Sequence, residues 1–273
     1  MRKNYLFTLL LALLIISCSR YEKILKSSDY NLKYKKAFEY YNKGEYVRAS
    51  TIFDQISAVF RGSNKADSVY FHQAMSYFHQ GDFILAGHYF ENFIKTYGNS
   101  KFAEDATYYK AFCHYKNSPR PSLDQTNTVQ AIQSFQLFVI KYPNSSRRDE
   151  CINIITELRE KLVEKSFMSA KLYFDLEDYK ASLVALNTSL NEYPDSKFRE
   201  DIMFMILKSS YLLAYHSVEK KKKERYQASL DEYYSFVAEF PESRYRKEAD
   251  RMYENTSKIL RIDNDINKPE DGL

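Results

Sequence analysis

Tryptophan is absent from this chain of 273 residues, and glycine and proline are scarce at six residues each. Every proline lies between stretches of helical apolar spacing or in the C-terminal tail, and proline cannot occupy a helix interior without cost. No apolar run reaches the roughly 20 residues that a helix needs to cross a bilayer. These absences predict an all-α protein that does not span a membrane.

A strong excess of one charge is also missing. The 40 basic and 36 acidic residues give a net charge of +4, and residues 1–17 hold two of the basic residues and no acidic one. Without residues 1–17 the chain carries a net charge of +2, which indicates no nucleic-acid or polyanion partner. The densest basic run, Lys220–Lys223, is expected to be a solvated loop, with contact to anionic lipid heads or an acidic partner as the alternative.

Patterns that carry chemistry are lacking too. The five histidines show no metal-ligand spacing, and there is no nucleophile elbow or glycine-rich phosphate loop. Cys113 and Cys151 lack the close ligands of a zinc site, and they are expected to be either two buried thiols or a disulfide. We therefore expect no enzyme, no metal, no cofactor and no small-molecule substrate, but a binding scaffold.

What the chain has in plenty is rings, 25 tyrosines and 19 phenylalanines, and they follow a recurring pattern. A small residue is followed four positions later by a bulky residue and seven positions after that by a ring. The copies are Ala49-Phe53-Phe60, Ala86-Phe90-Tyr97, Ala131-Phe135-Tyr142, Ser182-Leu186-Tyr193 and Ser229-Tyr233-Phe240. The bulky residues lie 37, 45, 51 and 47 positions apart, intervals typical of an α-solenoid built from helix hairpins.

The turns of these hairpins resemble those of tetratricopeptide repeats, with glycine at the inner turns, Gly44 and Gly81. We predict a superhelical solenoid of about five such hairpins, closed by a C-terminal capping helix. Repeats one to three are placed in residues 32–150, and repeats four and five with the capping helix in residues 151–262. Residues 263–273 are expected to be a disordered tail.

The N-terminus has the features of an exported lipoprotein. A basic start precedes an apolar core at Leu6–Ile16, which predicts a signal peptide over residues 1–17. The sequence Ile15-Ile16-Ser17-Cys18 resembles the bacterial lipobox, so Cys18 is the predicted lipid attachment site and residues 18–31 a polar tether. The alternative is an ordinary signal peptide with an incidental cysteine.

A candidate binding groove follows from aligning the repeats. In such solenoids the first helix of each repeat lines the concave surface, and positions i, i+4 and i+7 of the first three repeats are expected to face it. They are Tyr34, Phe38, Tyr41, Phe71, Met75, Phe78, Tyr108, Phe112 and Tyr115. A third to a half of these rings are expected to pack against the next repeat, yet their excess favours a groove for an extended apolar or aromatic peptide. In repeat five the corresponding Phe204, Lys208 and Tyr211 are candidates for contact with a partner.

Four features of the chain are informative in combination. They are the lipobox, a length of about 250 residues without the signal, five repeats, and the endings Tyr142-Pro143-Asn144-Ser145 and Tyr193-Pro194-Asp195-Ser196. Together they resemble the BamD family of outer-membrane protein assembly lipoproteins. The resemblance runs from Cys18 to about Leu260. It implies a lipid-anchored, periplasm-facing subunit of the β-barrel assembly machine. It further implies that the N-terminal repeats receive the aromatic-ended signal of unfolded barrel proteins, and that the C-terminal repeats hold the periplasmic domains of the barrel subunit BamA.

Two other functions stay open from the sequence. One is a periplasmic repeat adaptor that coordinates cell-envelope or division enzymes. The other is a glycan-binding outer-membrane lipoprotein, which is usually longer and would use a tryptophan-rich platform that this chain lacks. Ser19 after the lipobox cysteine is not an acidic retention signal, which favours the inner leaflet of the outer membrane.

Overall fold

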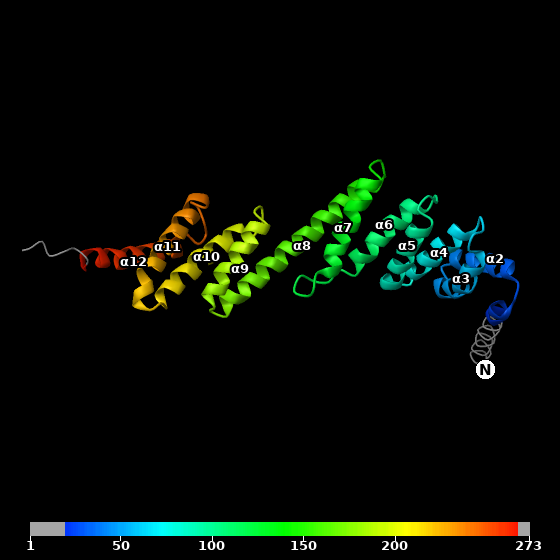
Figure 1. Cartoon of the computed structure of the whole chain (residues 1–273), viewed down its shortest axis with the longest axis horizontal. Helices are drawn as coiled ribbons and strands as arrows, with labels where there is room; N and C mark the ends of the chain where they lie inside the picture. Colours follow the sequence, from blue (N-terminus) through cyan, green and yellow to red (C-terminus); the bar gives the residue numbers. More distant parts are fainter. Residues whose placement is uncertain (1–19, 267–273) are drawn as a thin grey trace, which may run out of the picture. The chain divides into compact units, whose positions relative to one another are not determined.

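The structure, a computed structural model, describes residues 20–266, with side chains to residue 260, and every regular element in that range is a helix (Figure 1). The predicted signal peptide and lipid attachment site, residues 1–17 and Cys18, lie outside the described residues, as does the end of the predicted tail. Within residues 20–266, no helix is both long and apolar enough to cross a bilayer.

Successive helices pack as antiparallel hairpins. Residues 20–26 are helical, and the elements that follow are α2 (Tyr30–Asn42), α3 (Tyr46–Phe60), α4 (Ala66–His79), α5 (Phe83–Thr96), α6 (Ala103–Lys116), α7 (Thr126–Lys141), α8 (Arg148–Asp175), α9 (Tyr179–Glu192), α10 (Arg199–Tyr215), α11 (Glu219–Glu239) and α12 (Arg246–Ile266). Each helix from α2 to α6 packs against the next, as do α9 to α11, and α12 packs on both α10 and α11. The predicted all-α solenoid of tetratricopeptide-like hairpins with a capping helix is confirmed.

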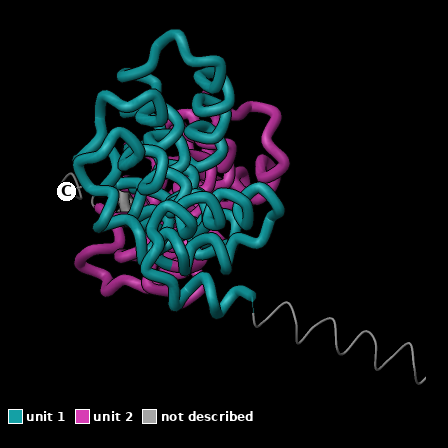
Figure 2. The backbone as a smooth tube through the Cα atoms, turned by 90° about the vertical axis from the view of Figure 1, so that its right-hand side faces the viewer, with its two compact units in different colours: residues 1–119, 124–158 teal, residues 120–123, 159–273 magenta. Residues whose placement is uncertain are grey.

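The chain divides into two compact units (Figure 2). Unit 1 comprises residues 1–119 and 124–158, and unit 2 comprises residues 120–123 and 159–273. The border after residue 158 falls inside the unbroken helix α8, whereas the sequence suggested a division at the start of that helix.

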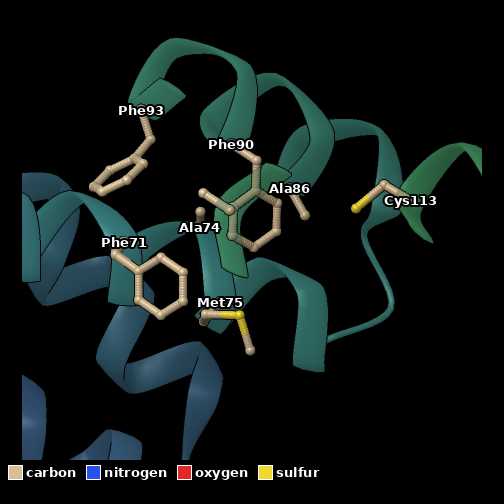
Figure 3. Close-up of a cluster of buried hydrophobic side chains, with 8 residues drawn as sticks. Phe71, Ala74, Met75, Ala86, Phe90, Phe93 and Cys113 are labelled. Carbon is tan, nitrogen blue, oxygen red and sulfur yellow. The ribbon is translucent and has the colours of Figure 1, made fainter. Parts of the chain in front are cut away.

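The recurring pattern of the sequence marks the core of each hairpin. All five small residues and all five bulky residues of the pattern are buried, among them Ala86 and Phe90 in the second repeat. Figure 3 shows Phe90 beside Ala74 and Ala86, with Phe71 and Met75 in the same cluster between α4, α5 and α6. The small residues let the helices approach closely, and the rings fill the space that remains.

The short inner turns of three hairpins contain a left-handed residue. Gly44 and Gly81 supply it in the first two repeats, with φ of 75° and 80°. Repeat four has Glu177 in the same place, with φ of 59°, the one non-glycine residue with positive φ in the described chain. Asp82 follows Gly81, and Asp178 follows Glu177. Each aspartate caps the next helix, because its carboxylate accepts a hydrogen bond from the backbone N–H three residues on.

The Tyr-Pro-Asn-Ser type endings form a second repeated turn. The serine N–H donates to the carbonyl of the ring residue, and the serine Oγ accepts from the N–H two residues on. The Oγ to N distances for Ser100, Ser145, Ser196 and Ser243 are 3.2, 3.2, 3.1 and 3.0 Å. The motif is therefore a turn that starts the next repeat, because the hydroxyl satisfies a backbone donor there.

The expected polar tether is in part a docked helix. Residues 20–26 lie against the first repeat, where the Tyr21 ring meets the Tyr40 ring edge-on at 5.5 Å and the Tyr21 hydroxyl donates to the Arg48 carbonyl at 3.2 Å. Ile24 and Leu25 pack on the same core.

Two other expectations about the C-terminal half are wrong. Lys220–Lys223 do not form a loop, because α11 begins at Glu219, and Lys222 pairs with Glu219 at 2.5 Å one turn away. Residues 263–266 belong to α12 and not to a disordered tail.

Candidate peptide-binding site

Rings on α2 and α4 meet across the interface between the first two repeats. The ring of His72 on α4 lies 4.8 Å from Phe38 and 5.0 Å from Tyr41, both of which come from α2, and both pairs are edge-on. His72 was not a predicted site residue, although its place directly after Phe71 in a ring-rich helix could have indicated it. Burial lowers the pKa of this imidazole, so it acts here as a neutral ring.

The contacts continue from α4 to α6. The Phe78 ring lies 4.9 Å from Tyr109 and 6.0 Å from Phe112, and Phe112 lies 5.5 Å from Tyr115. An unbroken series of ring contacts therefore joins the first helices of repeats one, two and three. Six predicted groove residues in this series keep part of their side chains exposed, and we name them the aromatic face: Tyr34, Phe38, Tyr41, Phe78, Phe112 and Tyr115.

The other three predicted groove residues belong to the core. Phe71, Met75 and Tyr108 are 7, 5 and 6 % exposed, so they cannot serve as open anchors. Phe71 is covered by Phe102, which stacks on it at 4.6 Å, and Met75 shares its cluster. Tyr108 is held by the next helix pair, because its hydroxyl donates to Glu150 at 2.7 Å.

Cations lie beside the aromatic face. The Nζ atoms of Lys65, Lys101 and Lys116 lie 4.8 to 5.1 Å from the centres of the Tyr34, Phe102 and Phe112 rings, a cation–π arrangement. No ion pair is formed by these three lysines within the described part of the chain. The face therefore combines exposed rings with positive charge that no carboxylate of the described chain neutralises.

Carboxylates near the face are already used as acceptors. Glu157 accepts from the Tyr115 hydroxyl at 3.0 Å, and Asp67 accepts from Ser100 at 2.7 Å. Burial, with the bond to Glu157, raises the pKa of Tyr115. Among residues 20–260, no three histidine, cysteine or acidic side chains gather as a metal site would require. The site therefore presents exposed rings beside ammonium groups, while its nearest carboxylates are already hydrogen-bonded.

The two cysteines are separate buried thiols. Neither Cys113 nor Cys151 forms a disulfide, and burial raises the pKa of Cys113 to about 12 and that of Cys151 to about 11. Both therefore remain protonated and unreactive at neutral pH.

The candidate partner residues of repeat five are covered by the chain itself. Phe204 is 5 % exposed and stacks at 4.1 Å on Tyr245, in the turn before α12. Lys208 pairs with Glu248 of α12 at 2.7 Å, and Tyr211 stays partly exposed beside the same helix. Phe204 is thus a core residue, because the capping helix occupies the side of α10 that was predicted to receive a partner.

Unit 2 exposes apolar side chains elsewhere, on α8, on α9 and in the turn between them. Leu172, Leu176 and Val184 are 55 to 67 % exposed, and Met168 and Tyr173 are more than two fifths exposed. Tyr173 and Val184 border a hollow of about 430 Å³. We name these five residues the apolar patch. Exposed apolar groups gathered in this way are typical of protein-interaction surfaces.

Comparison with known proteins gives one family. The YfiO family model, described as outer membrane lipoprotein, matches residues 27–225, which run from just before α2 into α11. No curated protein matches the chain. Among solved structures, the TPR2AB domain of yeast Sti1 in its pHSP90 complex is similar, with a TM-score of 0.39 and 12 % identity over 84 % of this chain and 99 % of that chain.

Proposed function

The chain belongs to the YfiO family of outer membrane lipoproteins, to which BamD belongs, and on that basis we propose that it is a non-catalytic scaffold of the β-barrel assembly machinery. In this proposal Cys18 carries the lipid, and the repeats face the periplasm from the outer membrane. The aromatic face binds the C-terminal segments of unfolded barrel proteins, and unit 2 binds a BamA-like barrel subunit.

The observation that carries the first part is the combination of rings and unpaired lysines on unit 1. A barrel segment that ends in an aromatic residue offers a ring and a terminal carboxylate at the same place. Phe112 is partly exposed, and the ammonium of Lys116 lies 5.1 Å from its centre. A ring that packs on Phe112 would bring its carboxylate within reach of this ammonium, which supports a site for an aromatic C-terminus.

The test is peptide binding measured by fluorescence polarisation, together with a thermal melt of each variant. Phe112→Ala should weaken binding of a peptide with a C-terminal phenylalanine by about tenfold or more, as expected of an anchoring ring. Phe90→Ala, in the core, should instead destabilise the fold by about 3–5 kcal/mol. Equal loss of stability in both variants, without selective loss of affinity, would move the peptide site elsewhere.

The carboxylate has its own matched control. Lys116→Ala should weaken binding of the peptide with a free carboxylate and leave binding of the C-terminal amide unchanged. Lys141→Ala should affect neither, because Lys141 on α7 also lies over a ring, at 5.3 Å from Tyr142, but that ring is not part of the aromatic face. If Lys116→Ala has no effect on the acid, or affects acid and amide alike, no carboxylate is bound there.

The second part of the proposal replaces Phe204 by the apolar patch as the contact for the barrel subunit. Leu172→Glu would place a charge among exposed apolar groups, and it should abolish co-purification of a barrel protein with repeated periplasmic domains. Leu137→Glu on α7 is the control, since Leu137 is 57 % exposed and lies in unit 1. Recovery of cell-wall or division enzymes in place of a barrel protein would favour the adaptor function.

A further inference from the structure

A basic hollow of about 590 Å³ lies where residues 20–26 meet α2 and the start of α3. Five cations and two carboxylates line it, a surplus of three positive charges, together with apolar groups such as Leu32. The charged residues are Arg20, Lys23, Lys36, Lys43, Arg48, Glu39 and Glu45.

The position of the first two cations is set by the docked helix. Tyr21 packs on Tyr40, and Ile24 packs on the core of the first repeat, so residues 20–26 cannot swing freely. Arg20 and Lys23 lie on the same helix and border the hollow. The helix therefore carries two cations to a fixed place beside the first repeat.

The carboxylates in the hollow are occupied. Glu39 accepts from Lys36 at 2.6 Å and from Lys43 at 2.9 Å, and these bonds lower its pKa to about 2. Glu45 pairs with Arg48. Because Glu39 stays ionised and is shared by two ammonium groups, the surplus of positive charge persists at neutral pH.

Arg20 and Lys23 form no ion pair or hydrogen bond with any other part of the described chain, so their charge faces solvent. Both side chains belong to exposed residues. They are the two cations of the hollow that a ligand can reach without breaking an existing pair.

Charge along the chain is concentrated at this end. Residues 20–48 hold eight basic and four acidic residues, a net charge of +4, whereas the chain from Cys18 onward carries +2 in total. The remainder is thus slightly negative. A basic segment on a chain that is otherwise close to neutral is the pattern of contact with an anionic surface.

Chain length then relates the hollow to the anchor. Only Ser19 lies between Cys18 and Arg20, so the Cα atoms of these two residues are at most about 7 Å apart. The polar headgroup region of one leaflet is about 5–8 Å deep. A lipid on Cys18 therefore holds the Arg20 backbone at the height of the phospholipid phosphates.

We propose that the basic hollow binds the phosphate groups of anionic phospholipids in the membrane that holds the anchor. The proposal rests on the proposed function in one respect, that Cys18 is lipidated. A guanidinium and an ammonium bind phosphate oxygens by charge-assisted hydrogen bonds, and the apolar wall at Leu32 accepts the start of the acyl region. The acyl chains fix the distance of the first repeat from the membrane, and the hollow fixes which side of it faces the membrane.

The test uses the chain from residue 18 with Cys18→Ser, so that no lipid can be attached, in flotation with vesicles. Vesicles of phosphatidylcholine alone are compared with vesicles that also contain phosphatidylglycerol. Binding should require phosphatidylglycerol and weaken as salt is added. Arg20→Ala with Lys23→Ala should lower the partition coefficient by about 30-fold, or about 2 kcal/mol at about 1 kcal/mol per cation.

The matched control is Lys220→Ala with Lys223→Ala, which removes two exposed cations at the same spacing from α11. It should leave binding unchanged. An equal loss in the control would mean that net charge alone drives binding, and no binding to either vesicle would also overturn the proposal. A further outcome is that the unaltered chain binds inorganic phosphate but no vesicle, and loses that binding on Arg20→Ala with Lys23→Ala. That result would overturn the lipid proposal and indicate a site for free phosphate.

Incorporation of labelled fatty acid into the unaltered chain, and its absence in Cys18→Ala, tests the anchor separately. If Cys18 incorporates the labelled fatty acid but the vesicle experiment fails, the hollow is refuted as a lipid site and the anchor stands. An unlabelled Cys18 would refute the anchor, and with it the height argument, whatever the vesicles show.

Discussion

Replacing one buried serine should make this protein more stable, against the usual direction of point substitutions. Ser189 lies on α9 with 1 % of its surface exposed, and its Oγ has no hydrogen-bond partner. The corresponding positions of the other repeats hold Ile56, Phe93, Phe138 and Phe236, all apolar and buried. Ser189 therefore places a hydroxyl where the repeat is built to exclude polar groups.

The magnitude follows from two terms. A buried polar group without a partner costs about 1–3 kcal/mol, which Ser189→Ala removes. The change from serine to alanine inside a helix adds about 0.5 kcal/mol of propensity. We expect a gain in the free energy of unfolding of at least about 1.5 kcal/mol.

Ser182 on the same helix is the control, because its Oγ bonds to the Ser209 Oγ at 3.1 Å and both residues are buried. Ser182→Ala brings the same propensity gain but leaves the Ser209 hydroxyl unpaired, at about 1–3 kcal/mol. Propensity cancels in the comparison, so Ser189→Ala should exceed Ser182→Ala in stability by at least about 2 kcal/mol. Urea unfolding followed by circular dichroism measures the difference. If Ser189→Ala proves no more stable than Ser182→Ala, the unpaired hydroxyl carries no cost and the reasoning is refuted.

Three further outcomes are expected. Glu177→Gly should raise the free energy of unfolding by about 0.5–1 kcal/mol, since glycine removes the left-handed strain of about 1–2 kcal/mol but costs about 0.4–1 kcal/mol through the freer unfolded chain; a lower urea midpoint would contradict this. Ala86→Leu should overpack the interface of α4, α5 and α6 and lower the free energy of unfolding by about 1–3 kcal/mol. The control Ile84→Leu, on the exposed side of α5, should change it by no more than about 0.5 kcal/mol. Equal thermal melts of the two variants would show that a small residue is not needed at position 86. Burial lowers the pKa of His72, so the folded state binds fewer protons than the unfolded state, and stability should fall as pH drops below the ordinary value of about 6.5. His72→Phe should flatten that slope in urea midpoints measured between about pH 7 and pH 5, and an unchanged slope would assign the pH dependence to other groups.

The hairpin core was predictable because its pattern is local. A small and a bulky residue four positions apart lie on one face of a helix, so the spacing of Ala86 and Phe90 is enough to identify the buried side of α5. The helix at residues 20–26 was equally readable, since Tyr21, Ile24 and Leu25 have the spacing of one helical face.

The aromatic face was only partly predictable, because exposure depends on contacts distant in sequence. The i, i+4, i+7 positions named the correct helices but could not show that Phe102 covers Phe71, 31 residues away, or that Glu150 holds Tyr108, 42 residues away. Phe204 is buried for the same reason, by Tyr245.

The prediction for the lysine run at the start of α11 failed for another reason, since like charges suggested a solvated loop. The helix is supported there by packing further along, where Tyr226 is 2 % exposed, and by the ion pair of Lys222 with Glu219. Tertiary burial of one ring outweighs the repulsion of neighbouring exposed lysines, which is small at the surface.

The course of α8 through the border between the units couples their folding. Cys151 and Leu158 are fully buried in the unit 1 part of this helix, and Ala170 is buried in the unit 2 part. Once one part has formed, the helix extends by one hydrogen bond per residue without repeating the costly nucleation step. Folding of either unit therefore favours folding of the other through the shared backbone. When unit 1 completes its core with the part of α8 up to residue 158, residues 159–175 need only extend a helix that is already nucleated.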